Sequence, residues 1–350
     1  MSSLFIFNGL FPAVSSLCIL MAILLSGCSQ TPTEDRLTQW RAEAIARNDA
    51  IIRQQGKTAK PKKWELFITG QTTKGLQKLD WEELESLATT RVSTTSPHNS
   101  KDLKAMLYFR GIAVSQLLDR FGVKPNATSI TFLGYDGFSS TVSISDLRRY
   151  PIILALERDG RPIPRSEGGP LSLIFPQSEY PQLHQEYAEQ FWAFYVTHAI
   201  VGNELAKIRI GNRILDSKTL DKLPLISVEE TVGYRQGWPI GKVKLHGVRV
   251  RDVLNAANVE IADNNVVIVK GKSAVSRDPN NPIRLRSADI RDCDILLVTR
   301  WGEDQKPIPS RLGGPITLAF TGSCYAIGNV QNSVDSDRPW LTFVEELEIK

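Results

Sequence analysis

The sequence has little cysteine, little histidine and no large excess of either charge. Four cysteines in 350 residues are too few for a disulfide-built scaffold, and their spacing is not that of a zinc site. The four histidines share no metal-ligand spacing. The 42 Lys and Arg residues exceed the 38 Asp and Glu residues by only four, without long runs, unlike the basic patch of a nucleic-acid binder. We therefore expect no metal site and no nucleic-acid partner.

Several catalytic signatures are also missing. The sequence has no Gly-x-Ser-x-Gly nucleophile elbow, no phosphate-binding loop and no dinucleotide fingerprint. Its 42% hydrophobic and 23% charged residues are nevertheless typical of a folded protein, which excludes wholesale disorder. At roughly 150 residues per domain, the length predicts about two domains.

The N-terminus lacks charged side chains, the first being Glu34. Residues 4–25 are predominantly apolar and lead into Leu-Ser-Gly-Cys28, which predicts a secretory signal peptide over residues 1–27. A cysteine directly after Leu-Ser-Gly resembles the lipobox of bacterial lipoproteins, which implies that Cys28 is acylated and becomes the mature N-terminus. The alternative is an uncleaved membrane anchor, which the polar residues and proline within the apolar segment disfavour.

The lipobox resemblance sets the expected location. We expect a protein anchored to the lipid bilayer through Cys28, in the bacterial cell envelope and facing the periplasm, at the outer membrane rather than the inner one. Residues 28–63 are predicted to form a polar tether, a short helix and a basic linker. The signal has no twin-arginine pair, so the chain is expected to cross the membrane unfolded.

The remainder of the sequence is interpreted as two diverged copies of one α+β domain, over residues 64–204 and 205–350. The alternating segment 64–70 recurs as 205–211, and each copy has the pattern of a half-buried strand that ends in glycine. Further segments recur in the same order: 111–121 as 247–257, 129–134 as 266–271, 146–154 as 289–297, 162–170 as 307–315, and Trp192 as Trp340. Chance does not explain so many matches in one order.

The strands predicted around Gly313-Gly314-Pro315, in the second copy, suggest a disulfide. Apolar strands are predicted over residues 295–299 and 316–320, on either side of that element. If they pair as an antiparallel hairpin, facing residue numbers sum to about 615, because antiparallel register keeps the sum constant. Cys293 and Cys324 sum to 617 and would therefore lie near one another. An oxidising compartment would permit a bridge between them.

The first copy carries a resemblance to a known family. A strand leads into Asp136-Gly137-Phe138, and an Asp-Gly-x-Pro-Ile run precedes the Gly-Gly-Pro of residues 168–170 and a closing Trp192. This order resembles the oxidoreductase molybdopterin-binding domain of the sulfite oxidase superfamily. The second copy lacks the Asp-Gly-aromatic triplet. The resemblance implies an α+β fold with mixed sheets and short helices in each copy.

In catalytic members of that family, a cysteine thiolate of the domain ligates molybdenum. The corresponding stretches, residues 91–100 and 230–238, contain no cysteine. The family also tends to place an arginine two residues after the proline of its Gly-x-Pro, where this sequence has Ser172 and Thr317. The resemblance therefore implies the fold of the family without the cysteine that ligates molybdenum and without the arginine that would neutralise an anionic cofactor. We expect the protein to carry no molybdenum.

Five residues remain as pocket candidates. Asp136-Gly137-Phe138 could line a pocket, although Asp-Gly is also a turn signal. Arg165 could meet an anionic ligand, or it could be a solvated loop arginine like its counterpart Arg311. His98 lies in the stretch that would hold the metal ligand. No residue is assigned a catalytic or metal-binding role.

The leading hypothesis is a non-catalytic envelope lipoprotein that binds a small ligand or a protein partner, without a cofactor. The alternative is an active oxidoreductase that holds a molybdenum–molybdopterin cofactor without the usual cysteine ligand. A purely structural spacer is a third possibility, and it leaves the Asp-Gly-Phe loop unexplained.

Overall fold

The computed structural model describes residues 63–96, 98, 102–232, 237–280, 282–321 and 340–350. The chain divides into two compact units, residues 1–57 and 58–350, and the description below concerns the second. The predicted signal peptide, Cys28 and the tether lie outside the described residues. Among the described residues, no helix is long and apolar enough to cross a membrane.

The described residues up to Glu204, called here the first half, form two sheets with short helices. The elements are β1 (Leu66–Gly70), β2 (Gln77–Leu79), α3 (Trp81–Leu87), β3 (Thr90–Thr94), β4 (Leu107–Ala113), α4 (Val114–Phe121), β5 (Ser129–Gly134), β6 (Ser139–Ser143), α5 (Ile144–Arg149), β7 (Ile153–Arg158), β8 (Arg161–Pro162), η1 (Arg165–Glu167), β9 (Ser172–Ile174), α6 (Gln182–Glu186), η2 (Glu189–Phe191) and β10 (Val196–Val201).

The described residues from Leu205 onward, called the second half, contain a similar series. The elements are β11 (Lys207–Ile210), β12 (Arg213–Asp216), α7 (Ser217–Leu220), β13 (Leu225–Thr231), β14 (Lys242–Arg249), α8 (Val250–Ala256), β15 (Val266–Gly271), η3 (Ala274–Arg277), β16 (Ile283–Arg286), α9 (Ser287–Asp292), β17 (Ile295–Trp301), β18 (Lys306–Pro307), η4 (Ser310–Leu312), β19 (Thr317–Phe320) and β20 (Val344–Ile349).

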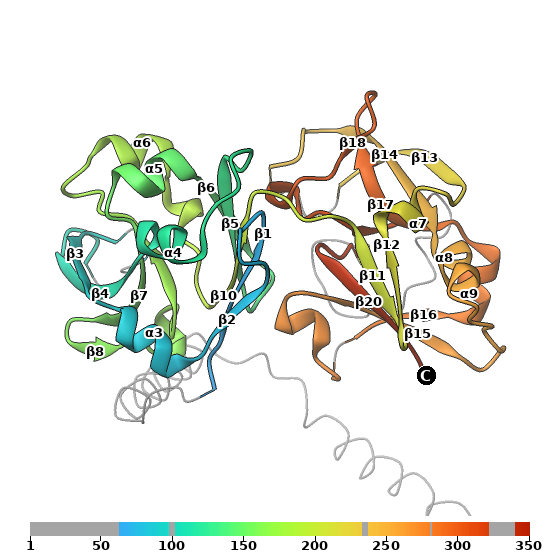
Figure 1. Cartoon of the computed structure of the whole chain (residues 1–350), viewed down its shortest axis with the longest axis horizontal. Coiled ribbons are helices and arrows are strands. Elements are labelled where there is room, and N and C mark those ends of the chain that lie inside the picture. The colour runs from blue at the N-terminus through green and yellow to red at the C-terminus, as the bar shows by residue number, and fades with distance from the viewer. Residues whose placement is uncertain (1–62, 97, 99–101, 233–236, 281, 322–339) are drawn as a thin grey trace, which may run out of the picture. The chain divides into compact units, whose positions relative to one another are not determined.

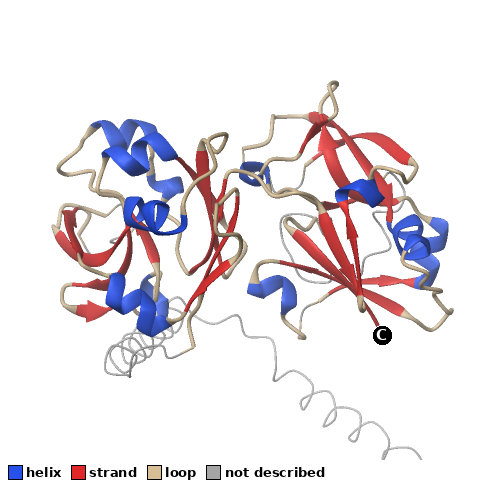
Figure 2. Cartoon of the chain, in the orientation of Figure 1, coloured by secondary structure: helices blue, strands red, loops and turns tan. Residues whose placement is uncertain are grey.

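The two halves have the same strand order (Figures 1 and 2). One sheet runs β2-β1-β10-β5-β6 in the first half and β12-β11-β20-β15-β16 in the second. The other runs β3-β4-β7-β8, with β9 on β7, and β13-β14-β17-β18, with β19 on β17. β1 pairs with β10, and β11 with β20, in parallel, whereas the other pairs are antiparallel. The predicted α+β fold with mixed sheets and short helices is confirmed.

The helices that follow β4 and β14 form where the apolar spacing predicted them. In α4 the side chains of Val114, Leu117, Leu118 and Phe121 are all buried, and in α8 the same holds for Val250, Val253 and Leu254. The glycine before each helix sits at a register shift of its strand. A β-carbon at Gly111 would lie 2.2 Å from the carbonyl oxygen of Leu154. Only glycine allows the strands to approach this closely.

The two Gly-Gly-Pro turns connect antiparallel strands as predicted. Ile295 faces Phe320 and Val298 faces Thr317, so the facing residue numbers sum to 615. The first glycine of each turn is left-handed, with φ of +90° at Gly168. A β-carbon on the second, Gly169, would lie 1.9 Å from the carbonyl oxygen of Ile163. The turn therefore requires glycine for conformation at one position and for space at the next.

One sequence match between the halves was wrong by one residue. The sequence comparison placed Phe67 opposite Ile208, in segments 64–70 and 205–211. In the structure Phe67 pairs with His198 of β10, and Arg209 pairs with Glu346 of β20, at the same place in the two sheets. Both segments alternate, so a slip of one residue exchanges the buried and exposed faces and goes unnoticed in the sequence.

Cys293 is buried at the C-terminal end of α9 and takes part in a disulfide. Its predicted partner, Cys324, lies outside the described residues. The pairing of β17 with β19, from which the disulfide was predicted, is confirmed, and the identity of the partner stays a prediction.

Candidate functional site

Asp136-Gly137-Phe138 forms the turn between β5 and β6. A carboxylate oxygen of Asp136 accepts a hydrogen bond of 3.1 Å from the backbone N–H of Phe138. Gly137 is left-handed with φ of +91°, and its N–H donates to the carbonyl of Gly134 at 3.2 Å. Of the two readings of this triplet, the structure shows the turn role.

Arg165 lies among three aromatic rings. The guanidinium carbon is 4.5 Å from the ring centroid of Tyr135, 5.5 Å from that of Trp64 and 5.6 Å from that of Tyr195. A cation over the faces of electron-rich rings is attracted by their quadrupoles. The side chain of Arg165 thus connects the loop after β8 to the segment before β1, the β5–β6 turn and the segment before β10.

His98 packs on aromatic side chains that precede β10. Its ring centroid is 4.8 Å from that of Phe194, edge-on, and 6.1 Å from that of Trp192. A β-carbon on Gly168 would lie only 2.4 Å from the Phe194 ring. His98 and the first Gly-Gly-Pro turn therefore both lie against the Phe194 ring.

Several hydroxyl groups near that aromatic packing are hydrogen-bonded within the protein, whereas the buried indole nitrogen of Trp192 has no hydrogen-bond partner in the described structure. Ser172 is 1% exposed, and its hydroxyl donates to the carbonyl of Gly168 at 2.6 Å. The backbone N–H of Thr95 donates to the hydroxyl of Ser178 at 3.0 Å, and Thr94 is fully buried. The sequence has no cysteine between Cys28 and Cys293. These residues offer neither a thiolate nor a free cation, so they do not fit a molybdenum–pterin group.

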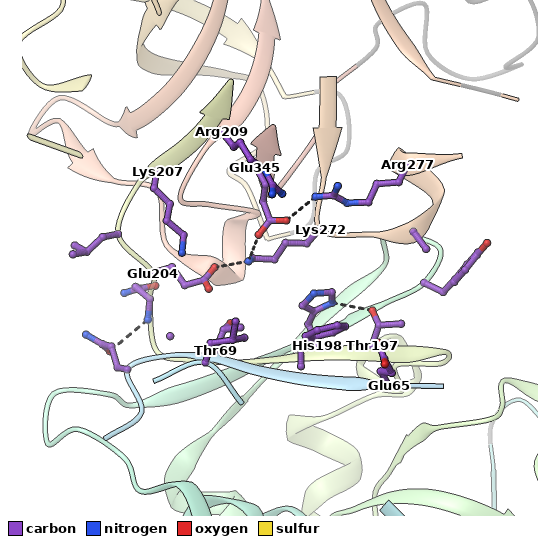
Figure 3. Close-up of a pocket in the computed structure, with 18 of the residues that line it drawn as sticks. Glu65, Thr69, Thr197, His198, Glu204, Lys207, Arg209, Lys272, Arg277 and Glu345 are labelled. Carbon is purple, nitrogen blue, oxygen red and sulfur yellow. Dashed lines mark hydrogen bonds and ion pairs between the residues drawn. The ribbon is translucent and has the colours of Figure 1, made fainter. Parts of the chain in front are cut away.

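A cleft of about 1280 Å³ lies elsewhere, between residues of the two halves (Figure 3). None of the five pocket candidates lines it. Its walls come from β1 and the start of β10 on one side, and from β11, η3 and the start of β20 on the other. Sequence reasoning missed this cleft, because its lining residues are distant in sequence and none belongs to a recognisable motif.

A buried ion-pair cluster forms one wall of the cleft. The side chain of Lys272 is only 7% exposed, and its ammonium lies 2.6 Å from a carboxylate oxygen of Glu345 and 3.2 Å from one of Glu204. Arg277 also pairs with Glu345, at 2.9 Å, and with Glu346, at 3.2 Å. Figure 3 shows Glu204 and Glu345 reaching this lysine, and Arg277 reaching Glu345.

The cluster holds its charges at neutral pH. Burial alone would lower the pKa of Lys272, but the two carboxylates outweigh it, and the pKa is raised. Burial would likewise raise the pKa of Glu345, and the charge of Lys272 reverses the effect. For His198, burial and the nearby Lys272 ammonium act together and lower the pKa to about 4. His198 is therefore neutral at neutral pH, and Lys272 cannot act as a base there.

The described residues contain no group of three or more His, Cys, Asp or Glu side chains that could hold a metal ion. The arrangement is suited to holding a charged ligand between two walls. General acid–base catalysis needs a group whose pKa lies near neutral pH. In the cleft, the pKa of His198 is instead lowered to about 4 and that of Lys272 is raised.

A family model described as "oxidoreductase molybdopterin binding domain" matches residues 54–180. Among solved structures, the chain is similar to the sulfane dehydrogenase SoxCD from Paracoccus pantotrophus, with 14% sequence identity and a TM-score of 0.33. That alignment covers 66% of this chain and 60% of the SoxCD chain. No curated protein matches the chain. The family match ends before β10, although β10 completes the sheet to which β1 and β5 belong.

Proposed function

We propose that this chain is a non-catalytic member of the oxidoreductase molybdopterin-binding domain family of the sulfite oxidase superfamily, whose model matches residues 54–180. In place of molybdenum redox chemistry, it binds a small ligand or a protein partner. The fold is retained as a scaffold, since function resides in the site and not in the fold.

The observation that carries this proposal is the absence of cysteine between Cys28 and Cys293. In catalytic relatives a soft thiolate donor binds the metal directly, and the hydroxyl groups near residues 91–100 cannot give the same bond. The packing of His98 on Phe194 supports the proposal, because it engages the histidine of that stretch in a contact within the protein. Ser172, in the place of the family arginine, is committed to Gly168.

The proposal includes the location inferred from the sequence. The chain is anchored to the bilayer through an acylated Cys28 and faces the periplasm, with the outer membrane as the expected site. The disulfide at Cys293 supports an oxidising compartment. Intact-mass measurement of the membrane fraction should show a lipid adduct on a chain that begins at Cys28. A soluble product, or one that retains Met1, contradicts this location.

Metal and pterin analysis tests the central proposal. The protein is purified from its native host grown with molybdate, and molybdenum is measured by mass spectrometry and pterin by fluorescence after oxidative release. A catalytic family member purified in the same way is the positive control. We expect no stoichiometric molybdenum or pterin. One molybdenum and one pterin per chain would overturn the proposal and establish the alternative, an oxidoreductase without the usual cysteine ligand.

A further inference from the structure

The carboxylates that line the cleft are already neutralised. Glu65 pairs with Lys78 at 2.9 Å, outside the cleft wall. Glu204 and Glu345 both pair with Lys272, at 3.2 Å and 2.6 Å. No lining carboxylate in the described part of the chain is therefore left to attract a cation.

The cleft also has cationic side chains that no carboxylate neutralises. Lys63, Lys124 and Lys207 all line it and are exposed, and none forms an ion pair with a described carboxylate. Lys207 extends from β11 above the opposite wall in Figure 3. A recessed surface with unneutralised charge of one sign concentrates counter-ions of the other sign. The cleft is therefore electrostatically suited to an anion.

Thr69, on β1, provides an independent indication of a ligand. The residue is 8% exposed and lines the cleft, yet its hydroxyl has no hydrogen-bond partner in the described structure. A buried hydroxyl without a partner is costly, and most buried polar atoms have one. Thr69 and Lys207 come from opposite walls (Figure 3). A ligand oxygen that reaches both would satisfy the hydroxyl and neutralise the ammonium.

Part of the remaining lining is apolar, and one portion of it is flat. Phe67 stacks on His198, with ring centroids 5.1 Å apart and an interplanar angle of 23°. Leu76 and Leu205 are 66% and 80% exposed, which is high for leucine. Trp64 adds a further aromatic surface. Because His198 is neutral at neutral pH, the stacked pair presents an uncharged face to a bound molecule.

We propose that the cleft binds a small organic anion, a carboxylate or sulfonate on a flat apolar body. Lys207 and Thr69 contact the anionic group, and the apolar body lies against the Phe67–His198 face. This proposal rests on the binding role proposed above and names the class of ligand and the residues that receive it. It requires no chemical step.

Isothermal titration calorimetry on the full mature chain in uncharged detergent tests this site. The probes are naphthalene disulfonate and naphthalene dimethanol, its uncharged counterpart, with detergent-only blanks. We expect one saturable site for the disulfonate and much weaker binding of the dimethanol. Lys207→Glu should weaken disulfonate binding about tenfold or more, which corresponds to about 1.4 kcal/mol. Lys218→Glu, an exposed control on α7 outside the cleft lining, should leave it unchanged.

Thr69→Val tests the hydroxyl separately. This near-isosteric change removes an unpartnered polar atom, so the chain should be as stable as the wild type, or more so, while disulfonate binding weakens. The proposal is overturned if no saturable heat is observed, if Lys207→Glu and Lys218→Glu act alike, or if both probes bind equally. Molybdenum is measured in the same samples. If molybdenum is present and the disulfonate still binds, only the proposal of a non-catalytic protein is overturned. If molybdenum is absent and the disulfonate does not bind, only the proposal of an anion site is overturned.

Discussion

The same position in the two halves carries opposite chemistry. In the first half, Phe67 of β1 faces His198 of β10 and the two rings stack. In the second half, the equivalent positions hold Arg209 and Glu346, which form an ion pair of 3.1 Å. The strand order around both pairs is identical. One backbone therefore supports either an apolar outer face or a charged one, and the strand order does not determine which.

The backbone immediately before β10, by contrast, matches the backbone immediately before β20. Tyr195 has a φ of +53° and Phe343 a φ of +52°, which is uncommon for residues other than glycine. The N–H of each donates to the carbonyl of the left-handed glycine in its own turn, at 3.0 Å to Gly168 and 2.7 Å to Gly313. What the halves share is thus backbone geometry, and what separates them is the side chains on the sheet faces.

The largest expected effect tests the shared geometry. Gly169→Ala and Gly314→Ala should each destabilise the chain by at least about 5 kcal/mol, because the added β-carbon meets a carbonyl oxygen of the backbone. The two clashes are almost equal, at 1.9 Å and 2.0 Å. Urea unfolding of purified variants measures the cost. Gly211→Ala is the control, since it has open space and only a left-handed φ, and should cost about 1 kcal/mol.

Equal costs in the two halves would support equivalent turns. If Gly314→Ala is tolerated while Gly169→Ala is not, the second turn is not equivalent to the first in energetic terms.

The next effect concerns the charged face of the second half. Lys272→Met should cost about 3 kcal/mol, because it removes a buried cation and leaves the largely buried Glu204 unpaired, while Glu345 keeps only Arg277. Lys270→Met, on β15, is the matched control: Lys270 also pairs with two carboxylates, but its side chain is 21% exposed against 7% for Lys272. We expect it to cost about 1 kcal/mol or less. Equal losses in thermal or urea unfolding would show that burial does not distinguish the two lysines.

The neutral histidine of the first half predicts a pH dependence. The pKa of His198 is about 4 in the folded chain, against an ordinary value of 6.5. The unfolded chain therefore binds the proton more readily between these two values, so stability is lost as pH falls from 6.5 to 4, by up to about 3 kcal/mol. His198→Gln, which keeps a polar group beside Thr197, should remove this component. Unfolding free energies of both proteins across that pH range measure it, and identical slopes would contradict the expectation.

The smallest effect compares the two turn arginines. Arg165→Met should cost about 1 kcal/mol, because it removes a cation from three aromatic rings. Arg311, at the second turn, makes no such ring contact within the described residues, so Arg311→Met should be nearly neutral. Thermal unfolding of the two variants side by side measures the difference. A loss for Arg165→Met no greater than that for Arg311→Met would show that the three ring contacts of Arg165 add no stability.

Local patterns predicted much of the fold. The helical spacing of Val114, Leu117 and Leu118 identified the buried face of α4, because amphipathic spacing depends only on neighbours in sequence. The register of β17 on β19 followed from the positions of two apolar segments on either side of a Gly-Gly-Pro element, because antiparallel pairing keeps the sum of facing residue numbers constant. The match of segments 64–70 and 205–211 was off by one, because two alternating segments align almost as well at either register.

The candidate site could not be predicted in the same way. Thr69, Lys207 and Lys272 lie in three separate segments, and none has a neighbour in sequence that marks it. The five pocket candidates came from the family resemblance, so they pointed to the Gly-Gly-Pro side of the first half. There the structure brings His98 next to Phe194, and Arg165 next to Tyr135, as packing contacts.

The central place of β10 has a consequence for biosynthesis. β10 pairs with β1 at one edge and β5 at the other, and Trp64 reaches the carbonyl of Val196, 132 residues later in the chain, with a hydrogen bond of 2.9 Å. A chain that emerges from its N-terminus cannot close this sheet until residue 201 has been delivered. Such long-range pairing folds slowly. Until β10 is available, β1 and β5 expose unpaired strand edges that can pair with other chains. We therefore expect the incomplete first half to be prone to aggregation during its synthesis.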